Sequence, residues 1–190
     1  MILDALKLIQ NNLQNYIIEV EGLPDIIVLN NIAMAEELGG SNIHMNGRIV
    51  ISLVNLQEES TLKNTANYRV KNGQAVYQNP PTSLNLFILF SVLDNQYENA
   101  LRLLSRVIEF FQWRRLLSPS LTPGNMENLE NSKDFEICMD LYSLTFEQLN
   151  HLWGALGGKQ VPFALYRARL VAVDAQKRQA EGPVITEIDR

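Results

Sequence analysis

The sequence has few of the residues on which catalysis, metal binding and disulfide formation depend. Its 190 residues include one cysteine, Cys138, and two histidines, His44 and His151. A single cysteine cannot form a disulfide within the chain, which indicates folding in a reducing compartment. The N-terminus has no basic stretch followed by an apolar run and a small-residue cleavage site, so no signal peptide is predicted.

Long apolar runs and a surplus of basic residues are also missing. The most apolar stretch, Leu84–Leu93, has ten residues and is interrupted by Asn85 and Ser91, whereas a membrane-spanning helix needs about 20 apolar residues. The net charge is −5, which argues against binding to nucleic-acid phosphates. The composition therefore predicts a soluble protein that neither enters a membrane nor binds nucleic acid.

The chain lacks the sequence motifs of common catalytic and metal sites. It has no His-Glu-x-x-His segment, no cluster of cysteine and histidine, and no Gly-x-Ser-x-Gly elbow. Gly157-Gly158-Lys159 resembles part of a phosphate-binding loop, but Gln160 stands where Ser or Thr is required, and a strand is expected to follow. Cys138 lies in an alternating strand, which favours a structural thiol. We therefore predict no enzymatic activity, cofactor or metal ion.

The residues that are present favour a folded domain. Hydrophobic residues make up 46% of the chain and charged residues 19%, enough to bury a sizeable core. Residues 1–60 contain eight acidic and two basic residues. The basic residues gather in the second half: Arg102, Arg106, Arg114, Arg115, Arg167, Arg169, Lys177 and Arg178. This asymmetry suits head-to-tail contact between copies, although a solvated surface is the commoner explanation.

Apolar spacing predicts an α+β fold with a mixed, largely antiparallel sheet packed with a few helices. A first helix is expected over Ile2–Asn15. A second helix is expected in the middle of the chain, ending at Trp113, and a third runs from Thr145 to the Gly157-Gly158 pair. Strands are expected at Ile26–Leu29, Arg48–Leu56, Tyr68–Lys71, Gln74–Tyr77, Leu84–Leu93, Phe135–Tyr142 and Phe163–Val173. Asn72-Gly73 indicates a tight antiparallel hairpin, and Leu84–Leu93 is predicted to be the innermost strand.

Local signals also locate the ends and buried faces of two helices. Asp94 is expected to cap the second helix. The predicted apolar stripe of that helix consists of Tyr97, Leu101, Leu104, Ile108 and Phe111. Thr145 and Gln148 form a predicted capping box at the start of the third helix, and Leu144 and Leu149 stand where a hydrophobic staple would. Trp153 shares a helical face with Leu149, so it is predicted to be buried and structural.

The predicted organisation is one domain over residues 1–175 and a flexible C-terminal arm over residues 176–190. The arm begins with Lys177 and Arg178 and contains the β-prone Val184 and Ile185. Such a segment is too short to bury a core of its own, but it can add a strand to the sheet of a partner. We therefore predict that these four residues contact a partner.

Arg114 and Arg115 follow the aromatic end of the second helix. Their position leaves two explanations open. They can contact an acidic partner, or they can interact with the negative end of the helix dipole. Both residues are therefore candidates for a partner contact.

Several blocks of sequence, taken in order, resemble a known family. These are the prolines and strand of Asn79–Phe90, the helix Tyr97–Ile108, the helix Leu149–Gly158 and the strand Val161–Val171. Together they resemble the terminator or cap proteins of extracellular contractile injection systems, the phage-tail-like particles that include antifeeding prophages and Photorhabdus virulence cassettes. The resemblance covers roughly residues 1–175.

The resemblance implies a tail-terminator-like fold and a structural role without catalysis. Its members assemble in the cytoplasm as a six-fold ring on the distal end of the inner tube and sheath and end their polymerisation. The implied partners are further copies of the chain, the tube protein and the sheath protein. Two alternatives remain at this point: the terminator of an ordinary phage tail, and an α/β ligand-binding domain whose site is not visible in the sequence.

Overall fold

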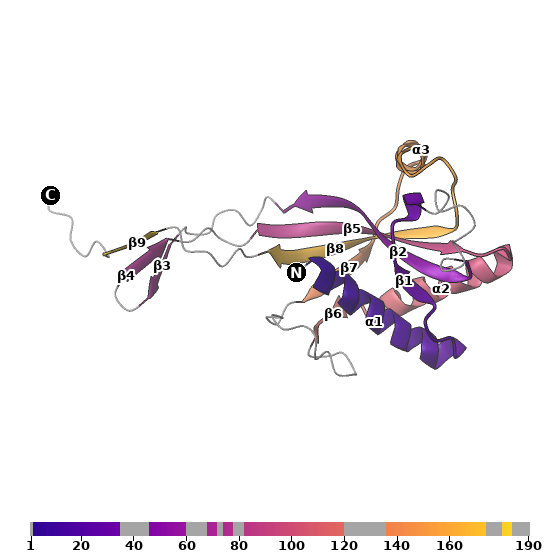
Figure 1. Cartoon of the computed structure of the whole chain (residues 1–190), viewed down its shortest axis with the longest axis horizontal. Coiled ribbons are helices and arrows are strands. Elements are labelled where there is room, and N and C mark those ends of the chain that lie inside the picture. Colours follow the sequence, from indigo (N-terminus) through magenta and orange to yellow (C-terminus); the bar gives the residue numbers. More distant parts are fainter. Residues whose placement is uncertain are drawn as a thin grey trace.

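The computed structural model describes residues 2–34, 46–59, 68–71, 74–77, 82–119, 136–173 and 180–183. Within these ranges the helices are α1 (Ile2–Glu21), the short 3-10 helix η1 (Ile32–Met34), α2 (Tyr97–Trp113) and α3 (Phe146–Ala155). The strands are β1 (Ile27–Leu29), β2 (Arg48–Glu58), β3 (Tyr68–Lys71), β4 (Gln74–Tyr77), β5 (Thr82–Leu93), β6 (Leu116–Leu117), β7 (Ile137–Leu141), β8 (Phe163–Val173) and β9 (Ala180–Pro183), labelled in Figure 1.

The strands form two sheets. The main sheet has six strands in the order β1-β2-β5-β8-β7-β6. β1 pairs with β2 in parallel, and the other neighbours are antiparallel. The second sheet has the order β3-β4-β9. These findings confirm the predicted α+β class, the mixed sheet, the hairpin between β3 and β4, and the central place of β5.

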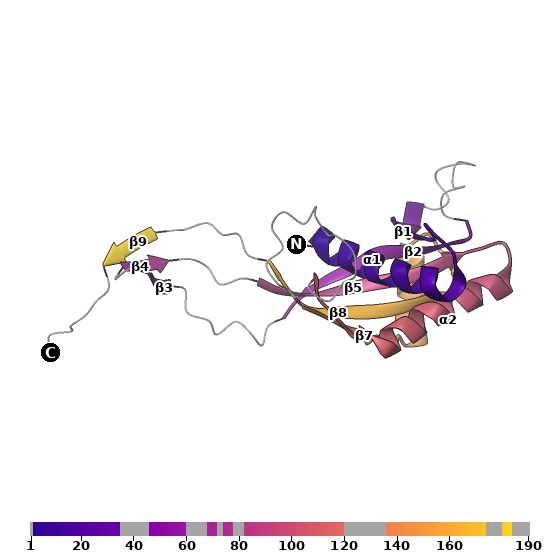
Figure 2. The same ribbon diagram turned by 90° about the horizontal axis from the view of Figure 1, so that it is seen from below.

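Helices α1 and α2 cover one face of the main sheet (Figure 2). α1 buries a stripe of apolar residues at helical spacing, from Ala5 through Leu13 to Ile17. The helix was predicted to end at Asn15, but it continues for six more residues because Ile17 still faces the core. It ends where Gly22 adopts a φ of +67°, a conformation that glycine allows without strain.

The predicted apolar stripe of α2 was wrong for most of its members. The buried residues are Ala100, Leu103, Val107, Phe110 and Phe111. Of the predicted stripe, Phe111 is buried and Leu104 packs at the margin of the core, whereas Tyr97, Leu101 and Ile108 are exposed. Both sets repeat at helical spacing, so periodicity alone could not choose between them. The position of the sheet and of α1 decided which set is buried.

Asp94 was predicted to be the N-cap of α2, but its side chain bonds the backbone of Gln96, the residue before the helix. Its Oδ1 accepts a hydrogen bond of 2.8 Å from the backbone N–H of Gln96. Gln96 is the N-cap residue, and no side chain bonds the first turn from that position. Asp94 Oδ2 also accepts a hydrogen bond from the side-chain amide of Asn99 in the first turn of α2. Asp94 therefore ties the turn before the helix to its first turn without being the N-cap residue.

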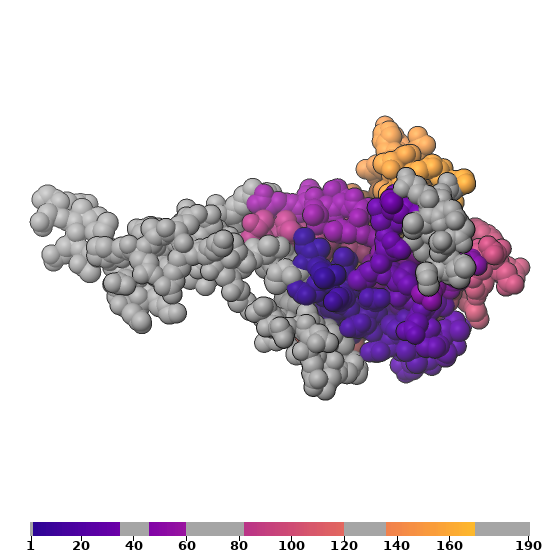
Figure 3. Space-filling view, viewed as in Figure 1, coloured from indigo at the N-terminus to yellow at the C-terminus, as the bar shows by residue number. Residues whose placement is uncertain are grey.

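Helix α3 packs on the opposite face of the sheet, where it stands out as a separate ridge (orange in Figure 3). The predicted capping box is confirmed: Gln148 N–H donates to Thr145 Oγ1 at 3.3 Å, and Thr145 N–H donates to Gln148 Oε1 at 3.1 Å. The predicted burial of Trp153 is also confirmed, since only 5% of its surface is exposed. Gly157 and Gly158 end the helix with φ values of +107° and +84°.

The main sheet is broad at one end and narrow at the other. β1 flanks β2 at the broad end, β7 and β6 flank β8 along its middle, and β2, β5 and β8 run on together past them toward the narrow end (Figures 1 and 2). The sheet β3-β4-β9 lies beyond that end. β9 was not predicted: Ala180–Pro183, part of the predicted flexible arm, pairs with β4. No helix in the described ranges is long and apolar enough to cross a membrane.

Candidate interaction surfaces

The face of the main sheet that carries α3 is only partly covered, and we call it the open face. Side chains alternate between the two faces along each strand. Tyr166 and Ala168 of β8 point into the core beneath α1 and α2, while Leu165 packs beneath α3. Arg167 and Arg169 therefore lie on the open face, beyond the part that α3 covers.

Three arginines on this face surround one carboxylate. Asp140 Oδ1 in β7 accepts a hydrogen bond from Arg115 Nη2 at 2.5 Å. Arg169 Nε and Arg167 Nη2 form ion pairs with Asp140 Oδ2 at 2.5 and 3.8 Å. We call Arg115, Arg167 and Arg169, with Asp140, the arginine cluster. All three arginine side chains are at least 36% exposed. The cluster carries an excess of positive charge and is suited to contact an acidic surface.

Arg169 also connects the cluster to the single cysteine. Its Nη2 donates a hydrogen bond to Cys138 Sγ at 3.5 Å. This bond, together with the charge of Asp140, raises the pKa of Arg169 above its ordinary value. Cys138 is half-buried in β7, and its thiol borders the arginine cluster through this hydrogen bond.

The sequence indicated Arg115 as a contact residue but did not indicate its neighbours. Arg114 is the C-cap residue of α2, with its N–H bonded to the carbonyl oxygen of Phe110 at 2.8 Å. The Arg115 side chain instead forms an ion pair with Asp140 of β7, a different element of the fold. Sequence reasoning missed Asp140, Arg167 and Arg169 as a group, although charges at alternate strand positions were a visible signal.

A groove lies on the open face between α3 and β2. It has a volume of about 560 Å³ and is lined mainly by apolar side chains, including Val54, Phe87, Tyr142, Leu152 and Leu165. Phe87 and Tyr142 meet edge to face with ring centroids 5.1 Å apart. The groove thus has a rigid aromatic floor.

The outward side of α2 is a second apolar surface. Its members are three residues of the predicted stripe: Tyr97, with 65% of its surface exposed, Leu101 and Ile108. Trp113 is also exposed, at 69%, but it lies on the side of α2 that faces α1, where it stacks on Tyr16. A row of exposed apolar residues on a helix is typical of a contact surface.

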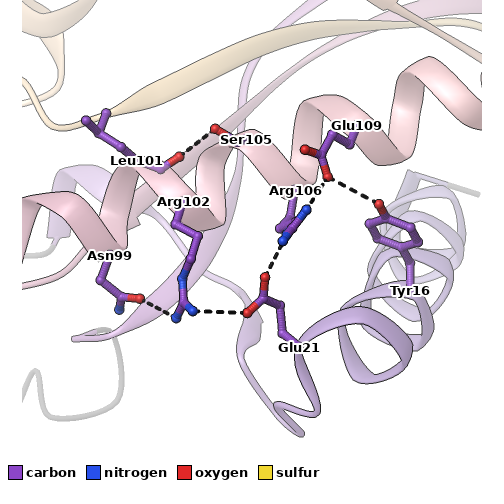
Figure 4. A network of polar contacts seen from close by, with 8 residues as sticks. All are labelled: Tyr16, Glu21, Asn99, Leu101, Arg102, Ser105, Arg106 and Glu109. Carbon is purple, nitrogen blue, oxygen red and sulfur yellow. Dashed lines mark hydrogen bonds and ion pairs between the residues drawn. The ribbon is translucent and has the colours of Figure 1, made fainter.

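A network of charges joins the C-terminal part of α1 to the middle of α2 (Figure 4). Glu21 accepts Arg106 Nε at 2.6 Å and Arg102 Nη1 at 3.2 Å. Arg106 also bonds Glu109, which accepts the hydroxyl of Tyr16 at 3.5 Å. The hydrogen bond from Arg106 lowers the pKa of Glu21, and the bonds to Glu109 and Glu21 raise the pKa of Arg106. We assign this network to the packing of the two helices.

The narrow end of the main sheet has two strand edges without a partner strand in the described part of the chain. β1 pairs only with Ile49–Ile51 of β2, and we call Leu53–Gln57 the β2 outer edge. β7 pairs only with Tyr166–Arg169 of β8, and we call Leu170–Val173 the β8 outer edge. Such edges present backbone hydrogen-bonding groups to any strand that approaches them.

The other candidate residues of the sequence fall outside these surfaces. Lys177, Arg178, Val184, Ile185 and His44 lie outside the described residues. His151 is exposed on α3. Over the ranges that the structure describes, no group of three or more His, Cys, Asp or Glu residues is placed to hold a metal ion.

Known proteins share this architecture. A family model described as the Pvc16 N-terminal domain matches residues 5–187. The solved sheath/tube terminator of the PVC extracellular contractile injection system, in its extended state, has a TM-score of 0.64 and 14% identity, covering 100% of this chain and 62% of that chain.

A second solved structure is the tube-terminating cap of the anti-feeding prophage. It has a TM-score of 0.49 and 13% identity, and the match covers 75% of this chain and 48% of that one. Among curated proteins no sequence matches the chain. The chain spans 62% of the length of the PVC terminator and shares its fold over that part.

Proposed function

The chain belongs to the Pvc16 N-terminal domain family, and we propose that it is a structural cap that ends the polymerisation of the tube and sheath of a contractile injection particle. The observation that carries the proposal is the family match, which extends over residues 5–187. The shared fold with a sheath/tube terminator, over the full length of this chain, supports it. The predicted resemblance to terminator and cap proteins is thereby confirmed.

The physical task of a cap is compatible with the surfaces described above. A tube or sheath grows because each layer exposes a surface that binds the next layer. A cap must bind the last such surface without presenting it again, and this requires contact surfaces rather than catalytic groups. Strand edges, an apolar helix face and the arginine cluster supply contacts of this kind.

We further propose that the cap is a ring of six copies that contacts both tube and sheath. Arg115 would contact an acidic partner through the arginine cluster, with Arg114 beside it. In the arm, Lys177 and Arg178 would contribute charge, while Val184 and Ile185 would add a strand to a partner. The particle would be assembled in the cytoplasm, and the cap would act without catalysis.

The proposal is tested by assembling particles with and without this chain and measuring sheath and tube lengths by electron microscopy. Particles that lack the chain should show sheaths of variable length or empty, disassembling tubes, and adding the chain back should restore one length. Labelled chain should decorate one end of each particle. Normal, uniform particles in the absence of the chain would contradict a terminating role.

A further inference from the structure

We infer that the β2 outer edge of one copy pairs with the β8 outer edge of the next copy, so that the narrow ends of neighbouring copies join into one sheet. This inference rests on the proposed ring and adds the contact that closes it. The partner is therefore a second copy of this chain, held by main-chain hydrogen bonds.

The backbone of the β2 outer edge is oriented for such pairing. Glu59 N–H donates to the carbonyl oxygen of Ser83 in β5 at 2.9 Å. Because backbone groups alternate in direction along a strand, those of Glu58 and Leu56 point away from β5. Leu56 N–H indeed donates to the side-chain oxygen of Asn55 at 2.8 Å rather than to β5. The Asn55 side chain therefore takes the place that a carbonyl oxygen of a neighbouring strand would have opposite this N–H.

The β8 outer edge is oriented in the same way on the other side. The carbonyl of Ser83 faces β2, and Ser83 lies opposite Ala172 of β8. The two form a pair without hydrogen bonds between them, so the backbone groups of Ala172 point away from β5. Each copy therefore offers outward backbone groups on both sides of its narrow end.

The direction of the strands fits a ring. β2 and β8 are each antiparallel to β5, so they run parallel to each other. A rotation about an axis close to the strand direction brings β2 beside the β8 of the neighbouring copy in a parallel arrangement. The two edges are different surfaces, which makes the contact heterologous, and a heterologous contact that closes by rotation produces a ring.

The shape of the subunit fits as well. The main sheet has six strands, of which β2, β5 and β8 extend past β1 and β7 toward the narrow end (Figure 1). Because the flanking strands end earlier, a neighbouring copy can lie beside this stretch along the strand direction. This arrangement also covers edges that would otherwise attract other chains.

Charge complementarity favours the same neighbour. The arginine cluster adjoins the β8 outer edge, while the last residue of β2, Glu58, and the following residue, Glu59, carry carboxylates. Glu58 lies opposite Leu84 of β5, and Leu84 lies opposite Val171 of β8. The acidic end of one edge is therefore level with the basic side of the other, which directs the two edges toward each other.

A proline substitution blocks the outward donor of β2 without touching its ladder to β5. We expect Leu56→Pro to keep a cooperative melting transition close to that of the unaltered chain, because proline is tolerated where the N–H faces outward. Its self-association, measured by sedimentation and by ring counts in electron micrographs, should weaken by at least about tenfold. Leu56→Val keeps the N–H and should form rings normally. Folded Leu56→Pro that forms rings as readily as Leu56→Val would overturn the inference.

A cysteine pair keeps the inference testable if Leu56→Pro does not fold. In a Cys138→Ala background, Leu56→Cys is combined in turn with a cysteine at each position from 170 to 173. Disulfides need Cα atoms about 4.4–6.8 Å apart, so at least one pair should give a ladder of covalent oligomers on oxidation that ends at the closed ring. Each single cysteine should stop at a dimer or remain a monomer.

The outcomes separate this inference from the proposed function. If the Cys138→Ala chain forms rings and restores particle length, but no pair cross-links, the cap function stands and the edge contact is wrong. A cross-link from Leu56→Cys to Ile185→Cys instead would assign the β2 outer edge to the C-terminal arm and also overturn the inference. If the chain neither forms rings, alone or on particles, nor restores particle length, both proposals fail.

Discussion

The broad and narrow ends of the main sheet differ in what surrounds the same strands. At the broad end, Phe90 of β5 is buried between Phe111 of α2 and Tyr166 of β8, with ring centroids 5.1 and 5.6 Å away. At the narrow end, Leu56 of β2 is 46% exposed and bonds its N–H to a neighbouring side chain. One strand pairing thus continues from a packed core to an edge that no strand covers among the residues that the structure describes.

The comparison indicates a division of labour within one sheet. Burial of apolar side chains supplies most of the free energy of folding, and Phe90 lies where the two helices cover the sheet. The exposed stretch Asn55–Glu58 of β2 contributes little of it, so its residues are available for contacts between molecules. We therefore expect substitutions at the broad end to lower stability and substitutions at the narrow end to lower assembly.

The largest loss of stability should come from the centre of the broad end. Phe90→Ala should lower the free energy of unfolding by about 3–5 kcal/mol, because it opens a cavity among aromatic rings that cannot collapse. Urea denaturation of this variant should be compared with that of Leu56→Ala, whose cost should stay within about 1 kcal/mol because the side chain is half exposed. An equal loss of unfolding free energy in the two variants would contradict the proposed difference between the broad and narrow ends.

Trp153→Ala should produce a somewhat smaller loss, about 3 kcal/mol. Trp153 of α3 is buried against Phe163, in the smaller of the two apolar clusters. Its Nε1 is buried and has no hydrogen-bond partner in the structure. Trp153→Phe removes this unpaired donor and keeps most of the packing, so it should cost about 1 kcal/mol or less. A loss in Trp153→Phe as large as that in Trp153→Ala would argue for a role of the indole N–H.

The charge network between α1 and α2 should have a smaller effect that depends on pH. Arg106 lowers the pKa of Glu21 in the folded state. The stabilisation is therefore present above the ordinary glutamate pKa of about 4.3 and disappears as the pH falls through the lowered value. Glu21→Gln should melt below the unaltered chain at pH 7, and the difference should vanish at acid pH. Glu19→Gln, at an exposed position of the same helix, is the matched control and should show no such trend.

Deletion of residues 176–190 should have the smallest effect on folding. β9 pairs with β4 alone, so the deletion removes no strand from the main sheet and should leave the main melting transition nearly unchanged. The truncated chain should nevertheless cap particles less efficiently, because the arm is the proposed contact with a partner. Particle length distributions measure this effect. If the truncated chain capped particles as efficiently as the full chain, the arm would have no part in capping.

Features that depend on neighbours in the sequence were predictable. The hairpin of β3 and β4 followed from Asn72-Gly73, because few dipeptides adopt positive φ at both positions. The capping box of α3 followed from Thr145 and Gln148, which lie one helical turn apart. The end of α2 at Trp113 and the bounds of β8 agree with the prediction for the same reason: the breaks in the pattern are local.

Features that depend on distant parts of the chain were not predictable. The exposed row on α2 has the spacing of a core stripe, and only its position relative to the sheet leaves it outside. β9 lies in a polar segment without strand periodicity, and its pairing with β4 depends on where β8 ends. Asp140 lies in β7, between Arg115, which precedes it by 25 residues, and Arg169, so their contacts depend on the order of the strands.

The sequence by itself therefore determined the class of the fold, the sites of its turns and helix ends, and the family to which the chain belongs. These features rest on the conformational preferences of adjacent residues and on the order of the elements along the chain. The tertiary structure alone decided which helix face is buried, which charges meet, and where the flanking strands β1 and β7 stop along the main sheet. Those depend on the order of strands in the sheet and on where each neighbouring strand ends, and no local periodicity contains that information.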